Sequence, residues 1–342
     1  MCVIQATLND GKLKIMHNTR VLLTGGAGYI GSHMAKVLQR AGAHPVILDD
    51  LSKGYREALR YGEVIIGSTG NKRLLQKIFS QNRFDAVMHF AAFIEVGESV
   101  QSPARYYRNN VMNTQVLLET MMEQNVQNFV FSSSAAIFGE PQKLPINEYH
   151  PSAPVNPYGR SKLMVEQMLA DYDTACGLKS VSLRYFNAAG ADPEGELGER
   201  HEPETHLIPL VLRAASGKLE SISVFGTDYD TRDGTCIRDY IHVLDLCQAH
   251  MLALDHLLSG KPGGSYNLGN GSGFSVREVI EAARRVTGRN IVVHEEPRRI
   301  GDPAQLVADY SLACQVLGWI PRITDLETII EDAWRWEKQM LS

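Results

Sequence analysis

A glycine-rich turn between a short apolar run and a helical pattern constrains this chain most. The run RVLLT (20–24) leads into GGAGYIG, in which Gly25, Gly28 and Gly31 have the spacing GxxGxxG, and a helical pattern follows. Glycines at these positions let the backbone approach a pyrophosphate, which then rests on the positive amino end of the helix. A glycine turn can also simply join a strand to a helix, so its meaning depends on its surroundings.

The first half of the chain repeats the alternation of buried strand and helix. Strands are expected at 20–24, 44–50, 63–67, 84–92, 128–134 and 180–187, and helices at 71–82, 104–125 and 157–177. Apolar strands separated by helices indicate a parallel sheet that is covered on both faces. The sequence therefore predicts an α/β chain with a Rossmann-type doubly wound sheet.

The regular alternation of strand and helix ends after about residue 187. A loop at 191–206 is followed by expected helices at 207–217, 238–260, 274–288 and 326–340, with short strands at 222–226, 265–271 and 291–297. We predict a polar tail at 1–19, a dinucleotide-binding domain at 20–186, and a smaller mixed α/β substrate domain at 187–342. Residues 237–270 are expected to return to the first domain.

An acid at the end of the second strand favours one form of dinucleotide. Asp49 lies 24 residues after Gly25, where a carboxylate binds a ribose 2′-hydroxyl and repels a 2′-phosphate. This placement predicts NAD rather than NADP. The simpler interpretation is that Asp49 and Asp50 form a solvated turn.

A tyrosine and a lysine begin the helix expected at 157–177. Asn156 is a plausible N-cap and Pro157 suits the first helical position. Tyr158 and Lys162 then share one face at i,i+4 spacing, and a nearby cation favours a phenolate, which is a base. An ordinary amphipathic helix would show the same spacing.

Composition excludes several classes of protein. A net charge of -5 without a basic stripe argues against nucleic acid as a partner, and no apolar run is long enough to span a membrane. The five cysteines are scattered without a CxxC pair, which argues against disulfides or a metal site and favours a cytoplasmic protein.

Eight segments together resemble a known family: GGAGYIG, HFAAFIEVGESV, FSSSAAIFG, NPYGRSKLMVEQ, LRYFNAAGADP, DGTCIRDYIHVLDL, YNLGNG and RRIGDPA. They are similar to the extended short-chain dehydrogenase/reductases and, within these, to the UDP-glucose 4-epimerase family, from about Arg20 to Trp336. The resemblance implies reversible epimerisation of UDP-glucose and UDP-galactose at sugar C4. Oxidation by NAD would give a transient 4-keto sugar, and reduction from its other face would complete the reaction.

The resemblance also implies residue roles. Tyr158 would take the proton of the 4-hydroxyl, Lys162 would hold the nicotinamide ribose and lower the pKa of the tyrosine, and Ser134 would hydrogen-bond the same sugar oxygen. The implied cofactor-binding residues are Gly25, Gly28, Tyr29, Ile30, Gly31, Asp49, Asp50, Leu51, Ser68, Thr69, Phe90, Ala91, Ala92, Asn109, Ser132, Tyr158, Lys162, Tyr185 and Phe186. The implied substrate-binding residues are Ser134, Tyr158, Asn187, His206, Leu207, Ser223, Phe225, Arg238, Tyr240, Arg299, Asp302 and Leu306.

The sequence departs from the family pattern at several of these positions. Phe138 replaces a tyrosine, Ile94 replaces a lysine near the cofactor phosphates, and Ser68 and Thr69 stand where an acid usually meets the adenine. These changes bear on how tightly NAD is retained. Leu306 lies where the family places the residue beside the hexose C2 substituent, and a leucine there implies slower turnover of N-acetylated sugars.

Other functions remain open at this stage. A dehydratase of the same fold would carry acids after the strand-end serine, where this chain has Ala135 and Ala136. A 4-epimerase for UDP-N-acetylglucosamine or a UDP-pentose, and a non-catalytic NAD-sensing module, are further alternatives. The resemblance also implies a homodimer through the helices expected at 104–125 and 157–177.

Overall fold

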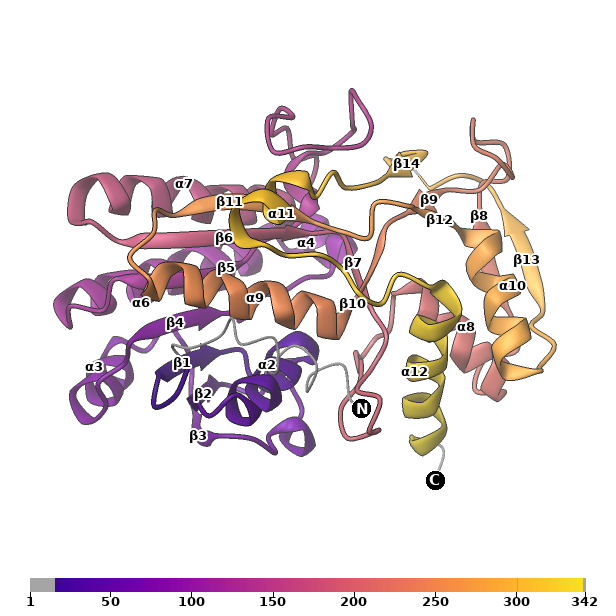
Figure 1. The fold of residues 1–342 in the computed structure, drawn as a ribbon. Coiled ribbons are helices and arrows are strands. Elements are labelled where there is room, and N and C mark those ends of the chain that lie inside the picture. The colour runs from indigo at the N-terminus through magenta and orange to yellow at the C-terminus, as the bar shows by residue number, and fades with distance from the viewer. Residues whose placement is uncertain (1–15, 300, 341–342) are drawn as a thin grey trace.

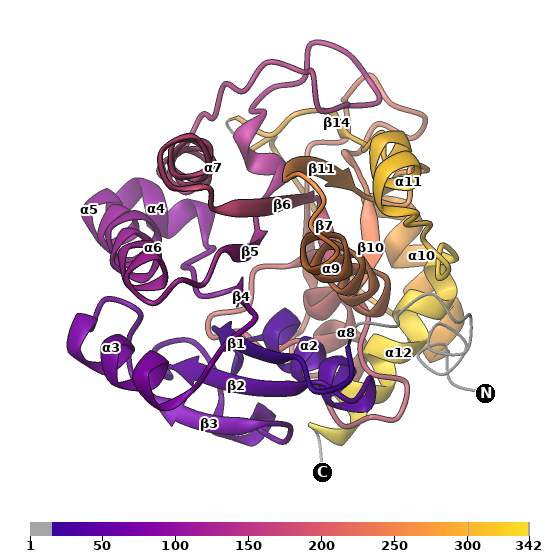
Figure 2. The ribbon, with the colours of Figure 1, turned by 60° about the vertical axis from the view of Figure 1, so that its left-hand side comes forward.

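A parallel sheet of seven strands runs through the centre of the molecule (Figures 1 and 2). The computed structural model describes residues 16–299 and 301–340, so most of the predicted tail at 1–19 lies outside the described residues. The strands follow the order β11-β6-β5-β4-β1-β2-β3. Their bounds are β1 Arg20–Thr24, β2 His44–Asp49, β3 Glu63–Ile66, β4 Ala86–His89, β5 Asn128–Ser132, β6 Lys179–Tyr185 and β11 Gly264–Leu268.

Helices cover both faces of this sheet. On one face lie α2 (Tyr29–Arg40) and α9 (Val243–Leu258), and on the other lie α3 (Lys72–Gln81), α6 (Asn113–Glu123) and α7 (Pro157–Cys176). The side chains of β1 alternate between the two layers, since Val21 and Leu23 join the core on the α2 side while Leu22 joins the other. The predicted Rossmann-type fold is therefore confirmed.

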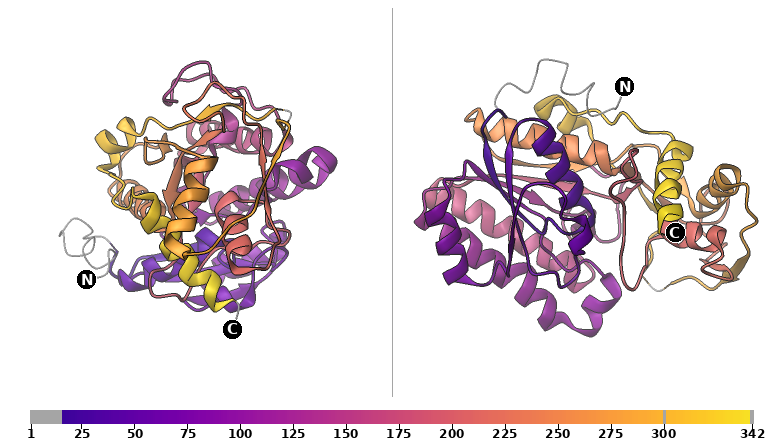
Figure 3. Two further views of the ribbon diagram at one scale, coloured as in Figure 1. Left: turned by 90° about the vertical axis from the view of Figure 1, so that its right-hand side faces the viewer. Right: turned by 90° about the horizontal axis from the view of Figure 1, so that it is seen from below.

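A smaller group of elements stands beside the carboxyl ends of the sheet (Figures 1 and 3). Its helices α8 (Leu207–Ser216), α10 (Val276–Thr287) and α12 (Leu326–Gln339) pack against one another. Beside them lie the parallel pair β8 (Ile222–Phe225) and β13 (Val293–Glu296), and a small sheet of β12 (Phe274–Ser275), β9 (Ile237–Arg238) and β14 (Gln305–Leu306). Helix α11 (Ser311–Leu317) contacts β11 and α9.

The chain passes between the two groups of elements more than once. Strand β7 (Asn187–Ala189) pairs in parallel with β10 (Tyr240–His242), and the chain then enters α9 and returns to the large sheet as β11. The expectation of one helix over 238–260 was wrong at its start. Residues 240–242 are extended because β7 supplies backbone partners, and the side chain of His242 accepts a hydrogen bond from Leu244 N (3.1 Å) where the helix begins.

The helix expected at 104–125 is also interrupted. It consists of α5 (Pro103–Tyr106), a π-helical segment η2 (Tyr107–Met112) and α6, and it follows the short helix α4 (Val96–Gln101). A π-helical turn changes which side chains face inward and is often found at functional sites. Within the described residues, no helix combines the length and apolar character that crossing a membrane requires.

Candidate active site

The predicted glycine turn leads out of β1, next to the loop that follows β4. Gly25 has φ +77°, and a Cβ at this residue would lie 2.4 Å from the backbone nitrogen of Ala91. A Cβ on Gly31 would lie 2.2 Å from the carbonyl oxygen of Gly25. Neither position tolerates a side chain, because backbone atoms block both. The turn lies where the strand order reverses between β1 and β4, which is where ligands of such sheets bind.

Asp49 ends β2 and stabilises this turn. Its Oδ2 accepts a hydrogen bond from Ala27 N (2.9 Å), and its Oδ1 accepts one from Leu51 N (2.8 Å). Leu51 has φ +59°, an unusual conformation for a residue with a side chain. Burial raises the pKa of Asp49, although these two N–H groups oppose the shift. Each oxygen retains a lone pair, so the carboxylate has capacity for a ribose hydroxyl.

Tyr158 and Lys162 are brought to the end of β5 by the first turns of α7. The predicted cap is confirmed, because Asn156 Oδ1 accepts a hydrogen bond from Gly159 N at 2.8 Å, with Pro157 at the first helical position. Lys162 is only 3% exposed, and its Nζ donates to the carbonyl oxygen of Ser132 at 2.7 Å. The same Nζ lies 5.9 Å from the centre of the Tyr158 ring.

Ser134 completes this group. It follows β5, and its hydroxyl accepts a hydrogen bond from Ala136 N at 3.2 Å; its side chain also acts on the Tyr158 phenol and lowers the pKa of that phenol. Burial has the larger effect, and it raises the pKa of Tyr158 overall. Burial also lowers the pKa of Lys162 to about 7. In the protein alone the expected lowering of the Tyr158 pKa is therefore not seen, because burial of the phenol outweighs the contribution of Ser134.

A buried asparagine that the sequence did not reveal holds the start of α7. Asn110 lies in the π-helical segment, where its Oδ1 accepts from Phe93 N (2.9 Å) and its Nδ2 donates to Phe93 O and to Ser161 Oγ (both 3.0 Å). Ser161 Oγ in turn donates to the carbonyl of Tyr158 at 2.7 Å. Asn109, the predicted residue, donates to Asn110 Oδ1 at 3.0 Å. Asn110 thus positions the backbone of the candidate base.

The other predicted cofactor residues lie mainly at the carboxyl edge of the sheet. Ser68 and Thr69 follow β3, Phe90 to Ala92 follow β4, Ser132 and Tyr185 end β5 and β6, and Phe186 comes next. Ile30 lies in the first turn of α2, and Asp50 is exposed after β2. The hydroxyl of Tyr29 donates to Gly190 O at 2.7 Å and so ties α2 to the segment after β7.

Several predicted substrate residues meet around the small sheet. Arg238 in β9 forms an ion pair with Asp302 at 2.9 Å, and it lies opposite Leu306 of the neighbouring strand β14. Leu306 packs against the cluster of Ala135, Ile137 and Phe138, which includes the short 3₁₀ turn directly after Ser134. The structure thus brings the predicted diphosphate and sugar residues together beside Ser134.

The remaining predicted substrate residues lie on neighbouring elements. The guanidinium of Arg299 stacks 3.9 Å from the centre of the Phe225 ring in β8, the strand that also carries Ser223. Asn187 and Tyr240 begin the paired strands β7 and β10, and Tyr240 is buried. Leu207 is the first residue of α8, and the Nδ1 of the preceding His206 faces Glu199 and Glu204.

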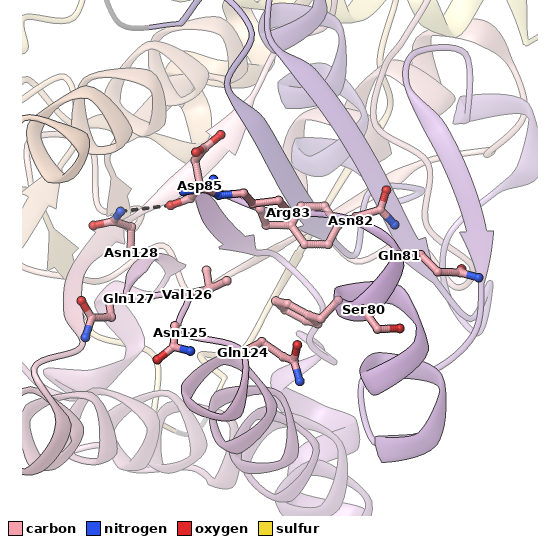
Figure 4. Close-up of a pocket in the computed structure, with 12 residues that line it drawn as sticks. Ser80, Gln81, Asn82, Arg83, Asp85, Gln124, Asn125, Val126, Gln127 and Asn128 are labelled. Atoms are coloured by element: carbon pink, nitrogen blue, oxygen red, sulfur yellow. Dashed lines mark hydrogen bonds between the residues drawn. The ribbon is translucent and has the colours of Figure 1, made fainter.

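A separate hollow lies away from all of these residues. It measures about 510 Å³ and is lined by residues 79–85 and 124–128, with Asn128 donating to the carbonyl of Asp85 at 3.0 Å (Figure 4). These segments lead into the amino ends of β4 and β5, the edge opposite the glycine turn. Because ligands of doubly wound sheets bind at the carboxyl edge, we assign no role to this hollow.

Comparisons with known proteins agree with this placement. The model of the NAD dependent epimerase/dehydratase family matches residues 21–269. A UDP-glucose 4-epimerase of Halalkalibacterium halodurans is 52% identical over 319 residues, which cover 93% of this chain and 96% of that protein.

Two solved structures have the same fold. The UDP-glucose 4-epimerase of Brucella ovis in complex with NAD has a TM-score of 0.91 at 51% identity, covering 92% of this chain and 97% of that one. The enzyme of Bifidobacterium longum in complex with NAD⁺ and UDP has a TM-score of 0.89 at 39% identity, covering 94% and 98%. By sequence, fold and the placement of its glycine turn, this chain belongs to the UDP-glucose 4-epimerase family of NAD-dependent enzymes.

Proposed function

We propose that this site interconverts UDP-glucose and UDP-galactose, with Tyr158, Lys162 and Ser134 as its catalytic residues. The observation that carries the proposal is the meeting of three side chains: the Ser134 side chain acts on the Tyr158 phenol, and the buried Lys162 Nζ lies 5.9 Å from the centre of the same ring. A phenol, a hydroxyl and a cation that meet at the carboxyl edge of the sheet can act together on one sugar oxygen.

The residues present fit NAD. Lys162 is buried, and its contact with the carbonyl of Ser132 uses one of its three protons, which leaves donors for a ribose diol. Asp49 has acceptor capacity for the other ribose, and a buried carboxylate there disfavours a 2′-phosphate. Bound NAD would supply the oxidation and re-reduction of sugar C4.

The protein's own residues would handle the proton and orient the sugar. Tyr158 would accept the proton of the 4-hydroxyl and return it when the new hydroxyl forms, while Ser134 would hydrogen-bond the same oxygen throughout. Because burial alone raises the pKa of Tyr158, removal of its proton requires the positive charge that Lys162 and the oxidised cofactor bring. Tyr158 would then act as a base only when the cofactor is bound, which limits the exchange of its proton with water at other times.

Two arginines would hold the diphosphate. Arg238 now pairs with Asp302, so a diphosphate would compete with that carboxylate for a guanidinium suited to bidentate binding. Arg299 stacks on Phe225, with its charged plane beside an aromatic surface that suits uracil. In our proposal the region of the diphosphate and uracil is surrounded by Asn187, Tyr240, His206 and Leu207.

Elimination of water is disfavoured at this site. The 3₁₀ turn after Ser134 begins with Ala135 and Ala136, neither of which can supply the acid or base that a dehydratase requires.

The test of the proposed epimerisation is to incubate the purified protein with UDP-galactose, without added dinucleotide, and to measure UDP-glucose. A failure to convert, with cofactor still bound, would favour the non-catalytic alternative.

We further propose a homodimer through the η2–α6 and α7 helices. Leu117 and Met121 of α6 are buried in the chain's own core and take no part in this surface. Met112 and Met164 are exposed on these two helices, which supports an apolar contact there. Sedimentation that shows only monomer at micromolar concentration would exclude it.

Free thiols support a reducing compartment as the location of this chain. The described cysteines are Cys176, Cys236, Cys247 and Cys314, and all four are unpaired.

A further inference from the structure

Two glutamates and two histidines converge in the segment that leads into α8. Glu199, His201, Glu204 and His206 each present one ligand atom, and the four atoms lie within 4.8 Å of one another. His206 Nδ1 is 2.9 Å from Glu199 and 3.0 Å from Glu204, and His201 Nδ1 is 3.3 Å and 3.7 Å from the same carboxylates. Ligands of a tetrahedral ion with bonds of about 2.0–2.1 Å lie about 3.4 Å apart, which is close to these separations.

Some of these atoms have no hydrogen-bonding partner. Glu204 Oε2 and His201 Nδ1 are buried and make no hydrogen bond within the described residues, although they lie 3.7 Å apart. The Glu204 side chain is only 1% exposed. A buried carboxylate oxygen without a partner is costly. These two atoms are therefore available as ligands for a cation.

A second acidic cluster nearby in the sequence has a cation of its own. Asp192, Glu194 and Glu196 surround the ammonium of Lys36 at 2.5, 2.9 and 2.7 Å, so a lysine supplies the cation there. Among the described residues, the ion-pair partners of Glu199 and Glu204 are His201 and His206. Within residues 16–299 and 301–340, no lysine pairs with Glu199 or Glu204.

We propose that Glu199, His201, Glu204 and His206 bind one divalent transition-metal ion, with zinc as the best fit. Two carboxylates and two neutral imidazoles match zinc in ligand type and number, and their charges balance its two positive charges. Four protein ligands leave no open position, so the ion is structural and takes no part in the epimerisation.

The position of the ion indicates what it stabilises. His206 directly precedes α8, and Trp336 of α12 donates to the carbonyl of Glu199 at 3.0 Å. The ion would therefore fasten residues 199–206 to the start of α8 and to α12. In the sequence this site has the spacing ExHxxExH over residues 199–206, which contains no cysteine.

The test measures metal directly and does not depend on activity. The untagged full-length protein is stripped with a chelator, incubated with zinc chloride, desalted and analysed by mass spectrometry for metals. We expect about one zinc per chain, and a higher unfolding temperature for the loaded protein. His201→Gln and Glu204→Gln should each lower the zinc content at least tenfold while the circular dichroism spectrum is unchanged.

Glu194→Gln is the matched control. It neutralises one carboxylate of the cluster that Lys36 already occupies, so its zinc content should equal that of the unchanged protein. Cobalt chloride provides a second probe, because a tetrahedral cobalt site absorbs strongly in the visible range and zinc should displace it. A reloaded protein with less than a tenth of an equivalent of zinc would overturn the proposal, and two protonated histidines would then balance the carboxylates. A zinc content in both ligand variants equal to that of the unchanged protein would overturn it as well.

Discussion

Lys162 Nζ donates a hydrogen bond of 2.7 Å to the main-chain carbonyl of Ser132. This contact fixes the first turns of α7 against the end of β5, two residues before Ser134. It explains how a serine from a strand end and a tyrosine from a separate helix come close enough for the serine to lower the pKa of the phenol. The lysine therefore has a structural part in the site in addition to its charge.

The first prediction concerns Tyr158→Phe. If Tyr158 is the base, the variant should lose about 10²–10⁴-fold in the rate of UDP-galactose conversion, the usual contribution of a positioned base. Its fold and bound cofactor should be preserved, because the ring still packs with Phe93 and Tyr106. Tyr172→Phe, further along α7, is the control and should retain full activity. A loss of less than about tenfold in Tyr158→Phe would contradict the role.

The second prediction follows from the desolvation of Lys162. Burial lowers its pKa in the folded protein to about 7, from 10.5 in the unfolded chain. Between these values the unfolded chain binds more protons, so this residue makes stability rise with pH. The loss of folding stability caused by burying the charged lysine is complete below about pH 7 and disappears towards pH 10.5.

Lys162→Met should therefore flatten this dependence in cofactor-stripped protein. Relative to wild type, the variant should be more stable at pH 6 than at pH 9 by about 2–3 kcal/mol, since each pH unit inside the window is worth about 1.4 kcal/mol. Urea unfolding at the two pH values measures this difference. Parallel pH profiles for the two proteins would show that the lysine is not desolvated.

The sequence predicted the features that depend on local patterns. Apolar runs gave the strands of the main sheet, and the Asn-Pro pair gave the start of α7, because caps and strand burial are encoded within a few residues. The role of Asn110 could not be predicted, since its partners Phe93 and Ser161 come from other elements. The strand at Tyr240–His242 was missed for the same reason, because β7 provides its partner.

The third prediction concerns the choice of cofactor. Dinucleotide released by denaturing the pure protein should be NAD, because the Asp49 carboxylate repels a 2′-phosphate. Asp49→Ala should weaken NAD binding about 10–100-fold, since hydrogen bonds to a charged group contribute about 1.5–3 kcal/mol. An exposed acid in the second half of α7 offers the control, and Asp171→Ala should change binding little. Release of NADP would refute the assignment.

The last prediction concerns the sugar. Leu306 packs against Ala135, Ile137 and Phe138, so it borders the turn that carries Ser134, and it lies opposite Arg238. A side chain in this place limits the room beside the hexose. We expect UDP-glucose and UDP-galactose to be the main pair, with slower but measurable turnover of UDP-N-acetylglucosamine.

Leu306→Tyr should reduce the turnover of the acetylated sugar further, because overpacking costs about 1–3 kcal/mol, or roughly 5- to 150-fold in rate. Leu306→Met keeps the volume and should change neither reaction by much. Both pairs are compared under identical conditions, and an unchanged acetylated rate in Leu306→Tyr would show that selectivity is set elsewhere.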